Sequence, residues 1–235
     1  MKRRRTSVNA DCHQKEYSIV NTADKTLLRL GLLIPFWLFT GVTLTGLAYP
    51  GYSHIDQAMS QLGAIGTPTH AVSPWINNLP LGVLFLLFGA GVGRRFRGTG
   101  LARLSALLIV IHGLASFATG LFSCDAGCAP PQPSLSQQIH NAAGLIMFLS
   151  LTLASGLWAV LGKTVLSSSR FAWFSVICTL LAVITVGLMA QAIESGQGFG
   201  LYQRINYGVS VLWIAALAWM ALNTASQGSG YDRKR

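Results

Sequence analysis

The sequence predicts an all-α polytopic membrane bundle of six transmembrane helices, from its low charge content and the spacing of its apolar stretches. Only 10% of the 235 residues are charged and 51% are hydrophobic, whereas soluble domains carry roughly 25% charged residues. Six stretches contain no Asp, Glu, Lys or Arg over about 20 residues, the length of helix that crosses a bilayer core. These stretches lie near residues 30–49, 74–93, 104–123, 139–162, 171–193 and 205–223.

Helices are the expected spanning form, because each helix satisfies its own backbone hydrogen bonds in lipid. The second stretch is the least regular, since it contains Asn77, Asn78 and Pro80. Pro74 or Pro80 is expected to mark its start, because proline is tolerated in the first turn of a helix. The basic run at residues 2–5 lies far from the first apolar stretch and no small-residue cleavage site follows it. The first stretch is therefore expected to be a retained anchor and not a signal peptide.

The basic residues predict the orientation in the membrane. Arg204 lies alone at one side, and the other sixteen of the seventeen Lys and Arg residues lie at the opposite side. The positive-inside rule then places both termini in the cytoplasm. The predicted organisation is a cytoplasmic basic tail at 1–26, a transmembrane domain at 27–223 and a cytoplasmic tail at 224–235.

The same distribution bears on partners. The net charge of +10 could indicate nucleic-acid binding, but the basic residues alternate with long apolar runs and form no stripe. Membrane lipids are therefore the expected partners and nucleic acid is not. The sequence leaves homo-oligomer formation open.

The first long outer segment, from Pro50 to Ser73, has a helical pattern. Ser53 resembles an N-cap with Asp56 three residues later, and Gly63 can end a helix. We expect a short interfacial helix on the outer surface with its apolar side towards the membrane. That apolar side consists of Ile55, Met59 and Leu62. The segment is either a structural lid or a wall that turns Asp56, Ser60 and Gln61 towards a pocket.

Cys124 and Cys128 in the second outer segment leave three alternatives open. Two cysteines with three residues between them at an oxidising surface suit a structural disulfide, and Gly127 would allow the tight turn. Free or metal-bound thiols and a redox-active pair are the others. Zinc would need a second pair of ligands. The candidates are His140 and either His54 or Asp56, but no fixed sequence spacing links them to the cysteines. The sequence identifies neither a metal nor a cofactor.

His140, Arg204 and His112 each have a structural and a functional interpretation. His140 either caps its helix or acts as a general base or ligand. Arg204 either binds an anionic ligand through its guanidinium or pairs with a nearby acid. The nearby acids are Asp56, Asp125 and Glu194. His112 lies in mid-helix, where an interhelical hydrogen bond is the simplest expectation, since a haem would need a second histidine at that depth.

Short motifs occur in order along the outer segments. They are GYS at 51–53, MSQLGA at 59–64, GTP at 66–68 and LFSCDAGC at 121–128, followed by His140 and by Gln203-Arg204. Together they resemble the bacterial and archaeal membrane family called domain of unknown function 998. The resemblance covers about residues 28–222 and implies a six-helix membrane bundle of unestablished activity. Together with the orientation above, it leads us to expect the chain in the bacterial cytoplasmic (inner) membrane. Ala129 departs from the pattern, which has proline there, and His54 and His112 lie outside it.

Four functions follow from these residues. The preferred one is a binding protein for a lipid or small ligand, with Gln61, Gln203 and Arg204 as ligand contacts. A metal-assisted lipid head-group hydrolase would use Asp56, Ser60, Asp125 and His140. A thiol oxidoreductase would use Cys124 and Cys128, but the outer side offers no second cysteine pair. A transporter would need charged or broken helices near the midplane. In each of the first two functions we expect the outer polar residues to converge in one site.

Overall fold

The structure is a computed structural model that describes residues 22–229, with side chains described as far as Thr224. Helices account for its regular structure, and residues 22–229 contain no strand. The long helices are α1 (Thr22–Leu47), α2 (Leu79–Arg95), α3 (Gly100–Leu121), α4 (Leu135–Thr164), α5 (Ser169–Ser195) and α6 (Phe199–Ser229). Three short ones are η1 (Met59–Gly63), η2 (Pro74–Asn78) and η3 (Ala126–Cys128).

Six helical segments, the second of them η2 joined to α2, are long and apolar enough to cross a bilayer. The predicted all-α bundle of six such helices is therefore confirmed. Helix α1 begins within the predicted tail 1–26, and α6 continues past residue 223. The remainder of both tails, residues 1–21 and 230–235, lies outside the described residues.

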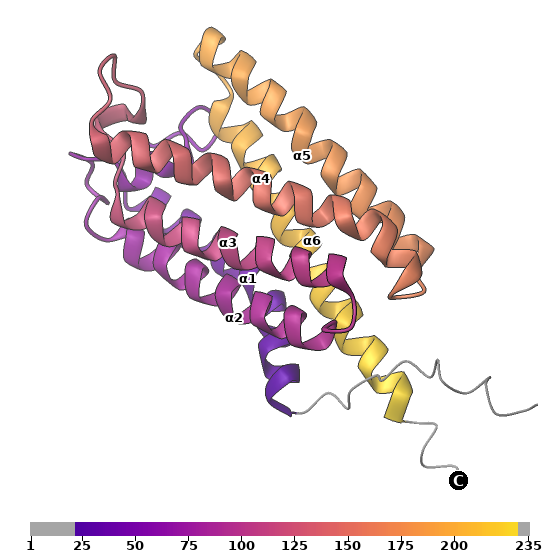
Figure 1. Cartoon of the computed structure of the whole chain (residues 1–235). Coiled ribbons are helices and arrows are strands. Elements are labelled where there is room, and N and C mark those ends of the chain that lie inside the picture. The colour runs from indigo at the N-terminus through magenta and orange to yellow at the C-terminus, as the bar shows by residue number, and fades with distance from the viewer. Residues whose placement is uncertain (1–21, 230–235) are drawn as a thin grey trace, which may run out of the picture.

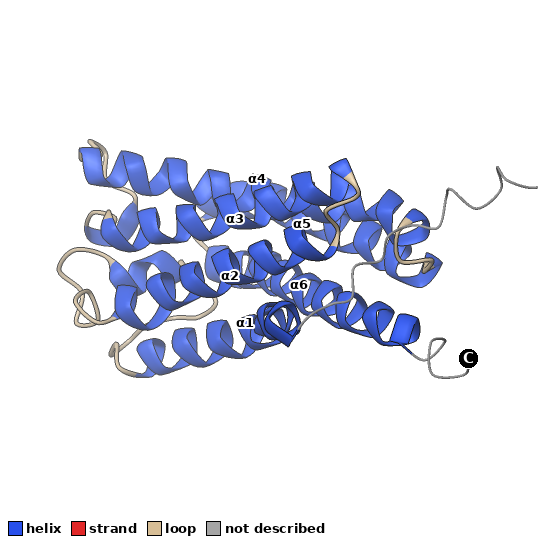
Figure 2. Ribbon diagram, turned by 60° about the horizontal axis from the view of Figure 1, so that its bottom comes forward, coloured by secondary structure: helices blue, strands red, loops and turns tan. Residues whose placement is uncertain are grey.

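The six long helices run beside one another in a bundle (Figures 1 and 2), and their contacts close it into a ring. Each helix packs against its neighbours in the sequence, and α6 packs back against α1. The start of α1 and the end of α6 lie at the same end of the bundle in Figure 1. Eight basic residues of the described chain belong to this basic end: Lys25, Arg29, Arg94, Arg95, Arg97, Arg103, Lys163 and Arg170.

The opposite end, here called the loop end, carries the connecting segments 48–73, 122–134 and 196–198. At the basic end, Arg94 Nη1 lies 3.6 Å from Asp24 Oδ1 and links α2 to α1. The loop end thus holds the long polar segments, while the basic end holds short turns and most of the positive charge.

The exterior of the bundle is apolar. Large side chains on α4 and α5 point outward, among them Leu149, Ile177 and Trp173, whose exposed fraction is 63%. Exposed apolar surface that is continuous over whole helices is typical of contact with lipid. The chain is therefore that of a multi-pass membrane protein.

The second spanning segment begins at Pro74 with the π-helical turn η2 and becomes α-helical at Leu79. Pro80 has no N–H, so it cannot donate to the carbonyl of Ile76 four residues earlier. The indole N–H of Trp37 in α1 donates to that carbonyl instead, at 2.8 Å. Pro74 is thus the start that the sequence offered as one of two possibilities, and Pro80 explains the irregular first turn.

His112 connects four helices in the middle of the bundle. Its Nδ1 lies 3.0 Å from the carbonyl oxygen of Met147 in α4, and its Nε2 lies 3.0 Å from the hydroxyl of Tyr207 in α6. A carbonyl only accepts, so Nδ1 carries the proton and Nε2 accepts from Tyr207. The ring also packs on Phe85 of α2, with centroids 4.2 Å apart. The expected interhelical hydrogen bond of His112 is confirmed.

We predict that Tyr207→Phe destabilises the bundle by about 0.6 kcal/mol and at most about 1.7 kcal/mol, the average and the maximum measured for interhelical hydrogen bonds in membranes. The variant leaves Nε2 of His112 without its donor while it preserves the aromatic ring. Unfolding in mixed micelles measures the effect. Tyr202→Phe is the matched control, because the Tyr202 hydroxyl makes no hydrogen bond to the described part of the chain. Equal stability of the two variants would contradict the assigned role of His112.

Candidate functional site at the loop end

Segment 48–73 folds differently from the single helix expected over residues 53–63. The Ser53 hydroxyl accepts from the Asp56 amide at 3.1 Å, as an N-cap would. However, the Gln57 side chain accepts from the Ser53 amide at 2.7 Å, and Ala58 is extended with ψ 148°. The chain therefore makes one turn over residues 53–57 and does not continue as a helix. Helix η1 is a short 3₁₀ segment that starts at Met59. A position of η1 on the membrane surface stays a prediction.

Arg204 lies near the start of α6 and holds segment 48–73 against that helix. Its Nη1 donates to the carbonyls of Gln57 at 3.0 Å and Gly200 at 2.9 Å. Its Nη2 donates to the hydroxyl of Tyr52 at 2.6 Å. Its guanidinium carbon lies 5.6 Å from the centre of the Tyr52 ring. Its Nε is buried and has no hydrogen-bond partner in the described residues.

Pairing with a nearby acid was the alternative interpretation of Arg204, and the described residues show no such ion pair. Within the described residues, Arg204 makes its hydrogen bonds to two carbonyls and a phenol and to no carboxylate. Asp56 accepts from the amide of Gly198 at 3.0 Å, and Asp125 accepts from Ser134. The positive charge of Arg204 is therefore held by neutral acceptors.

The charge of Arg204 influences the pKa values of its neighbours Tyr52 and His54. Burial raises the pKa of Tyr52, and the positive charge of Arg204 opposes that rise. Burial and, secondly, the charge of Arg204 lower the pKa of His54 below its usual 6.5. His54 is consequently neutral at pH 7 and adds no charge. Arg204 is thus the charged group among Arg204, Tyr52 and His54, while the ionised Asp56 lies in the same loop segment.

Three further contacts dock segment 48–73 on the start of α6. The Gln203 side chain accepts from the Met59 amide at 2.7 Å, and the Leu201 amide donates to the Ile55 carbonyl at 2.7 Å. The Gly198 amide also holds the pKa of Asp56 below its usual value, with help from the Ser53 hydroxyl. Gly200 permits this close approach, since a Cβ there would collide with the Gln57 carbonyl oxygen.

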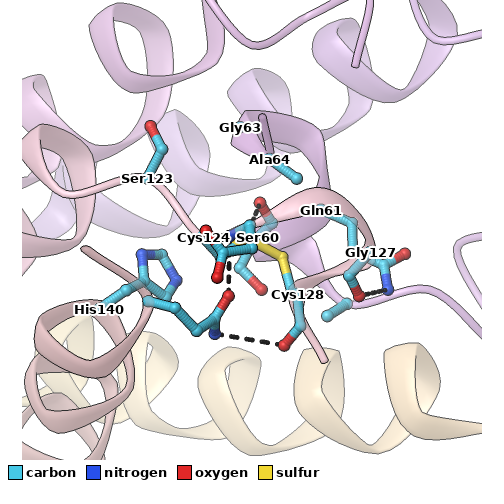
Figure 3. Close-up of a disulfide and its surroundings, with 12 residues drawn as sticks. Ser60, Gln61, Gly63, Ala64, Ser123, Cys124, Gly127, Cys128 and His140 are labelled. Carbon is cyan, nitrogen blue, oxygen red and sulfur yellow. Dashed lines mark hydrogen bonds between the residues drawn. A yellow bond between two sulfur atoms is a disulfide. The ribbon is translucent and has the colours of Figure 1, made fainter. Parts of the chain in front are cut away.

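Figure 3 shows the second polar group of the loop end, around the disulfide. Cys124 and Cys128 are bonded, with their Cα atoms 5.0 Å apart, which fits both a structural disulfide and a redox-active pair. Gly127 has φ 73° and makes the turn between them. Gln61 Nε2 donates to the Gly127 carbonyl at 3.0 Å, and Gln137 Nε2 donates to the Cys128 carbonyl at 3.2 Å.

Asp125 and His140 fix segment 122–134 to α4. Asp125 accepts from the amide and the hydroxyl of Ser134, the N-cap of α4, at 2.9 and 2.7 Å. These two bonds hold the pKa of Asp125 below its usual value. His140 Nδ1 lies 2.8 Å from the Phe122 carbonyl. That nitrogen must donate, so the lone pair of Nε2 is the one that could accept a proton.

Most of the predicted site residues, together with Tyr52, Gln57 and Gln137, thus form two hydrogen-bonded groups. We call them the Arg204 group (Tyr52, Asp56, Gln57, Gln203 and Arg204) and the disulfide group (Gln61, Cys124, Asp125, Cys128 and Gln137). Helix η1 joins them, because Met59 binds Gln203 and Gln61 binds Gly127. Ser60 contributes its carbonyl oxygen, 3.6 Å from Cys124 Sγ. No hydrogen bond between described residues connects Asp125, His140 and Arg204, so their convergence in one site stays a prediction.

Among the described residues, no three His, Cys, Asp or Glu side chains form a group that could hold a metal ion.

Three partners of the site were not expected from the sequence: Tyr52, Gln57 and Gln137. Tyr52 stands in the GYS motif, which was a usable signal. Gln57 accepts a hydrogen bond from Arg204 through its backbone carbonyl. Every residue type has this carbonyl, so the sequence could not reveal the contact.

The fold and the loop end define a six-helix membrane protein with two polar groups at one end. The chain matches the family described as "Protein of unknown function (DUF998)" over residues 32–220. It belongs to that family, as its motifs indicated. Searches of curated proteins and of solved structures found no match.

We predict that Gly200→Ala separates segment 48–73 from α6, because the new methyl group would meet the Gln57 carbonyl oxygen. Overpacking of this kind typically costs about 1–3 kcal/mol. Thermal unfolding in detergent measures the loss. Gly187→Ala is the matched control, since it adds the same atom to α5 with no neighbour within 4 Å. A Gly200→Ala protein as stable as the control would refute this close contact.

Proposed function

We propose that the chain lies in the bacterial cytoplasmic membrane with its basic end in the cytoplasm and its loop end outside. The distribution of charge supports this orientation, since eight of the nine Lys and Arg residues between 22 and 224 lie at the basic end and Arg204 lies at the loop end. Positive residues are retained on the cytoplasmic side during insertion. The long polar segments then face the periplasm or cell exterior.

Labelling of single cysteines with a membrane-impermeant maleimide in intact cells tests the orientation. We expect Ala71→Cys, in exposed segment 48–73, to react before lysis. We expect Gly98→Cys, in the exposed turn between α2 and α3, to react only after lysis. The reverse pattern would overturn the orientation.

At the loop end, we propose that the protein binds an anionic group at Arg204, either a lipid headgroup or a small anion such as phosphate. The carrying observation is that the guanidinium of Arg204 is hydrogen-bonded to Gln57, Gly200 and Tyr52, with no carboxylate partner in the described residues. A charge removed from water is costly unless it is paired. An anion would supply both the opposite charge and an acceptor for the unused Nε–H.

The geometry favours binding over catalysis. Both carboxylates proposed for a hydrolase, Asp56 and Asp125, are engaged in hydrogen bonds that shape their own loops. A metal-assisted reaction finds no three-residue ligand group in the described chain. A thiol oxidoreductase would need a second cysteine pair near the disulfide of Cys124 and Cys128. The free cysteine of the described residues, Cys178, is buried in α5. In contrast, an anion needs only hydrogen-bond donors, and one donor of the Arg204 guanidinium, the buried Nε–H, has no acceptor in the described residues.

Thermal stabilisation by added anions tests the proposal on the detergent-solubilised full chain. The probes are inorganic phosphate and dihexanoyl phosphatidylglycerol, which separate a free anion from a lipid headgroup. A ligand at 100 times its Kd stabilises the folded state by about 2.7 kcal/mol. We expect this gain in the wild type and its loss in Arg204→Gln. Arg204→Lys should bind more weakly, because an ammonium lacks the two-pronged donor geometry.

Arg103→Gln is the charge-matched control, since Arg103 is exposed at the basic end. It should keep the full response to the probe. Equal stabilisation of Arg204→Gln and the wild type by both probes would contradict the proposed anion site.

A further inference from the structure

Segment 48–73 occupies the groups of Arg204 that a ligand would use. The Gln57 carbonyl accepts a hydrogen bond from Nη1, and the Tyr52 hydroxyl accepts one from Nη2. The Nε atom is buried. An anion must therefore displace part of this segment before it can reach the guanidinium. In this arrangement residues 52–59 act as a lid over Arg204.

Just after the lid, the same segment 48–73 is tied to the disulfide group at two points. Gln61 Nε2 donates to the Gly127 carbonyl at 3.0 Å, inside the ring that the disulfide closes. The Ile65 amide donates to the Cys124 carbonyl at 2.9 Å. Two residues before Gln61, the Met59 amide binds Gln203, next to Arg204. A short path through η1 thus links the disulfide to the anion site.

The disulfide keeps its ring in a conformation that the backbone does not favour. Gly127 has φ 73°, and the next residue, Cys128, has φ 58°. The left-handed region is costly for a residue with a Cβ. Without the covalent bond, Cys128 can leave this conformation, and the Gly127 carbonyl can turn away from Gln61.

The two cysteine residues differ in exposure. Cys124 is fully buried, with an exposed fraction of 0%. Cys128 is half-buried and lies between the exposed residues Gly127 and Ala129. An external thiol therefore reaches the sulfur of Cys128 first. The released Cys124 thiol has an acceptor at hand, since its sulfur lies 3.6 Å from the Ser60 carbonyl oxygen.

We propose that Cys124–Cys128 is a redox latch on this lid, and that its reduction by an extracytoplasmic dithiol raises the affinity of Arg204 for anions. A thiolate of the dithiol attacks Cys128 Sγ, forms a mixed disulfide and expels Cys124, which takes up a proton. The second thiol of the donor then attacks the mixed disulfide and releases Cys128 as a thiol. The donor leaves as a disulfide, having supplied two electrons and two protons. This inference rests on the proposed anion site.

The test compares phosphate and dihexanoyl phosphatidylglycerol binding to the oxidised and the dithiothreitol-reduced full chain. The background is Cys12→Ala/Cys178→Ala, in which Cys124 and Cys128 are the remaining two of the four cysteines. We expect roughly two- to tenfold tighter binding after reduction, the change that one lost hydrogen bond produces. The added variant Cys124→Ser/Cys128→Ser should bind like the reduced protein and ignore dithiothreitol.

Gln61→Ala separates the latch from any direct effect of thiols. It removes the bond to the Gly127 carbonyl and should tighten binding in the oxidised state while it weakens the response to reduction. Arg204-dependent binding with the same affinity in both redox states would overturn the latch and leave the anion site standing. Binding that is unchanged by Arg204→Gln in both states would overturn the anion site together with the latch.

Discussion

The loop end is organised by a single constraint: a guanidinium partly withdrawn from water must be given acceptors. Arg204 takes them from Tyr52, Gln57 and its own helix. Because the first two belong to segment 48–73, satisfying the charge also fixes the path of that segment. The close approach at Gly200 and the Met59–Gln203 bond follow from the same docking. Removing a partner from a charged donor costs more than removing one from a neutral donor.

The rest of the molecule provides a rigid frame for that constraint. The ring of helices brings α6 back against α1, so that the start of α6 meets the segment that leaves α1. Deeper in the bundle, Tyr207 ties the next turn of α6 to His112. The disulfide group supports the other side of segment 48–73 through Gln61. The proposed anion site and the proposed latch therefore both depend on one docked loop.

The sequence predicted the helices well because their signal is repeated along each stretch. The absence of charged residues over whole spans fixes six segments, and the basic residues mark one end. The loop end was harder, because its contacts involve backbone groups. The Gln57 and Gly200 carbonyls on Arg204, and the Phe122 carbonyl on His140, have no signature in residue type. The helix expected over residues 53–63 failed for a local reason, since Gln57 closes a turn on Ser53.

The state of the Arg204 Nε–H tests the central claim most directly. In protein with ¹⁵N-labelled arginine, the Nε resonance that disappears in Arg204→Lys belongs to this residue. The account predicts that its proton exchanges slowly with water in the free protein and that its shift moves when phosphate or phosphatidylglycerol is added. Fast exchange together with an unmoved resonance would contradict a buried, unpaired donor that accepts an anion.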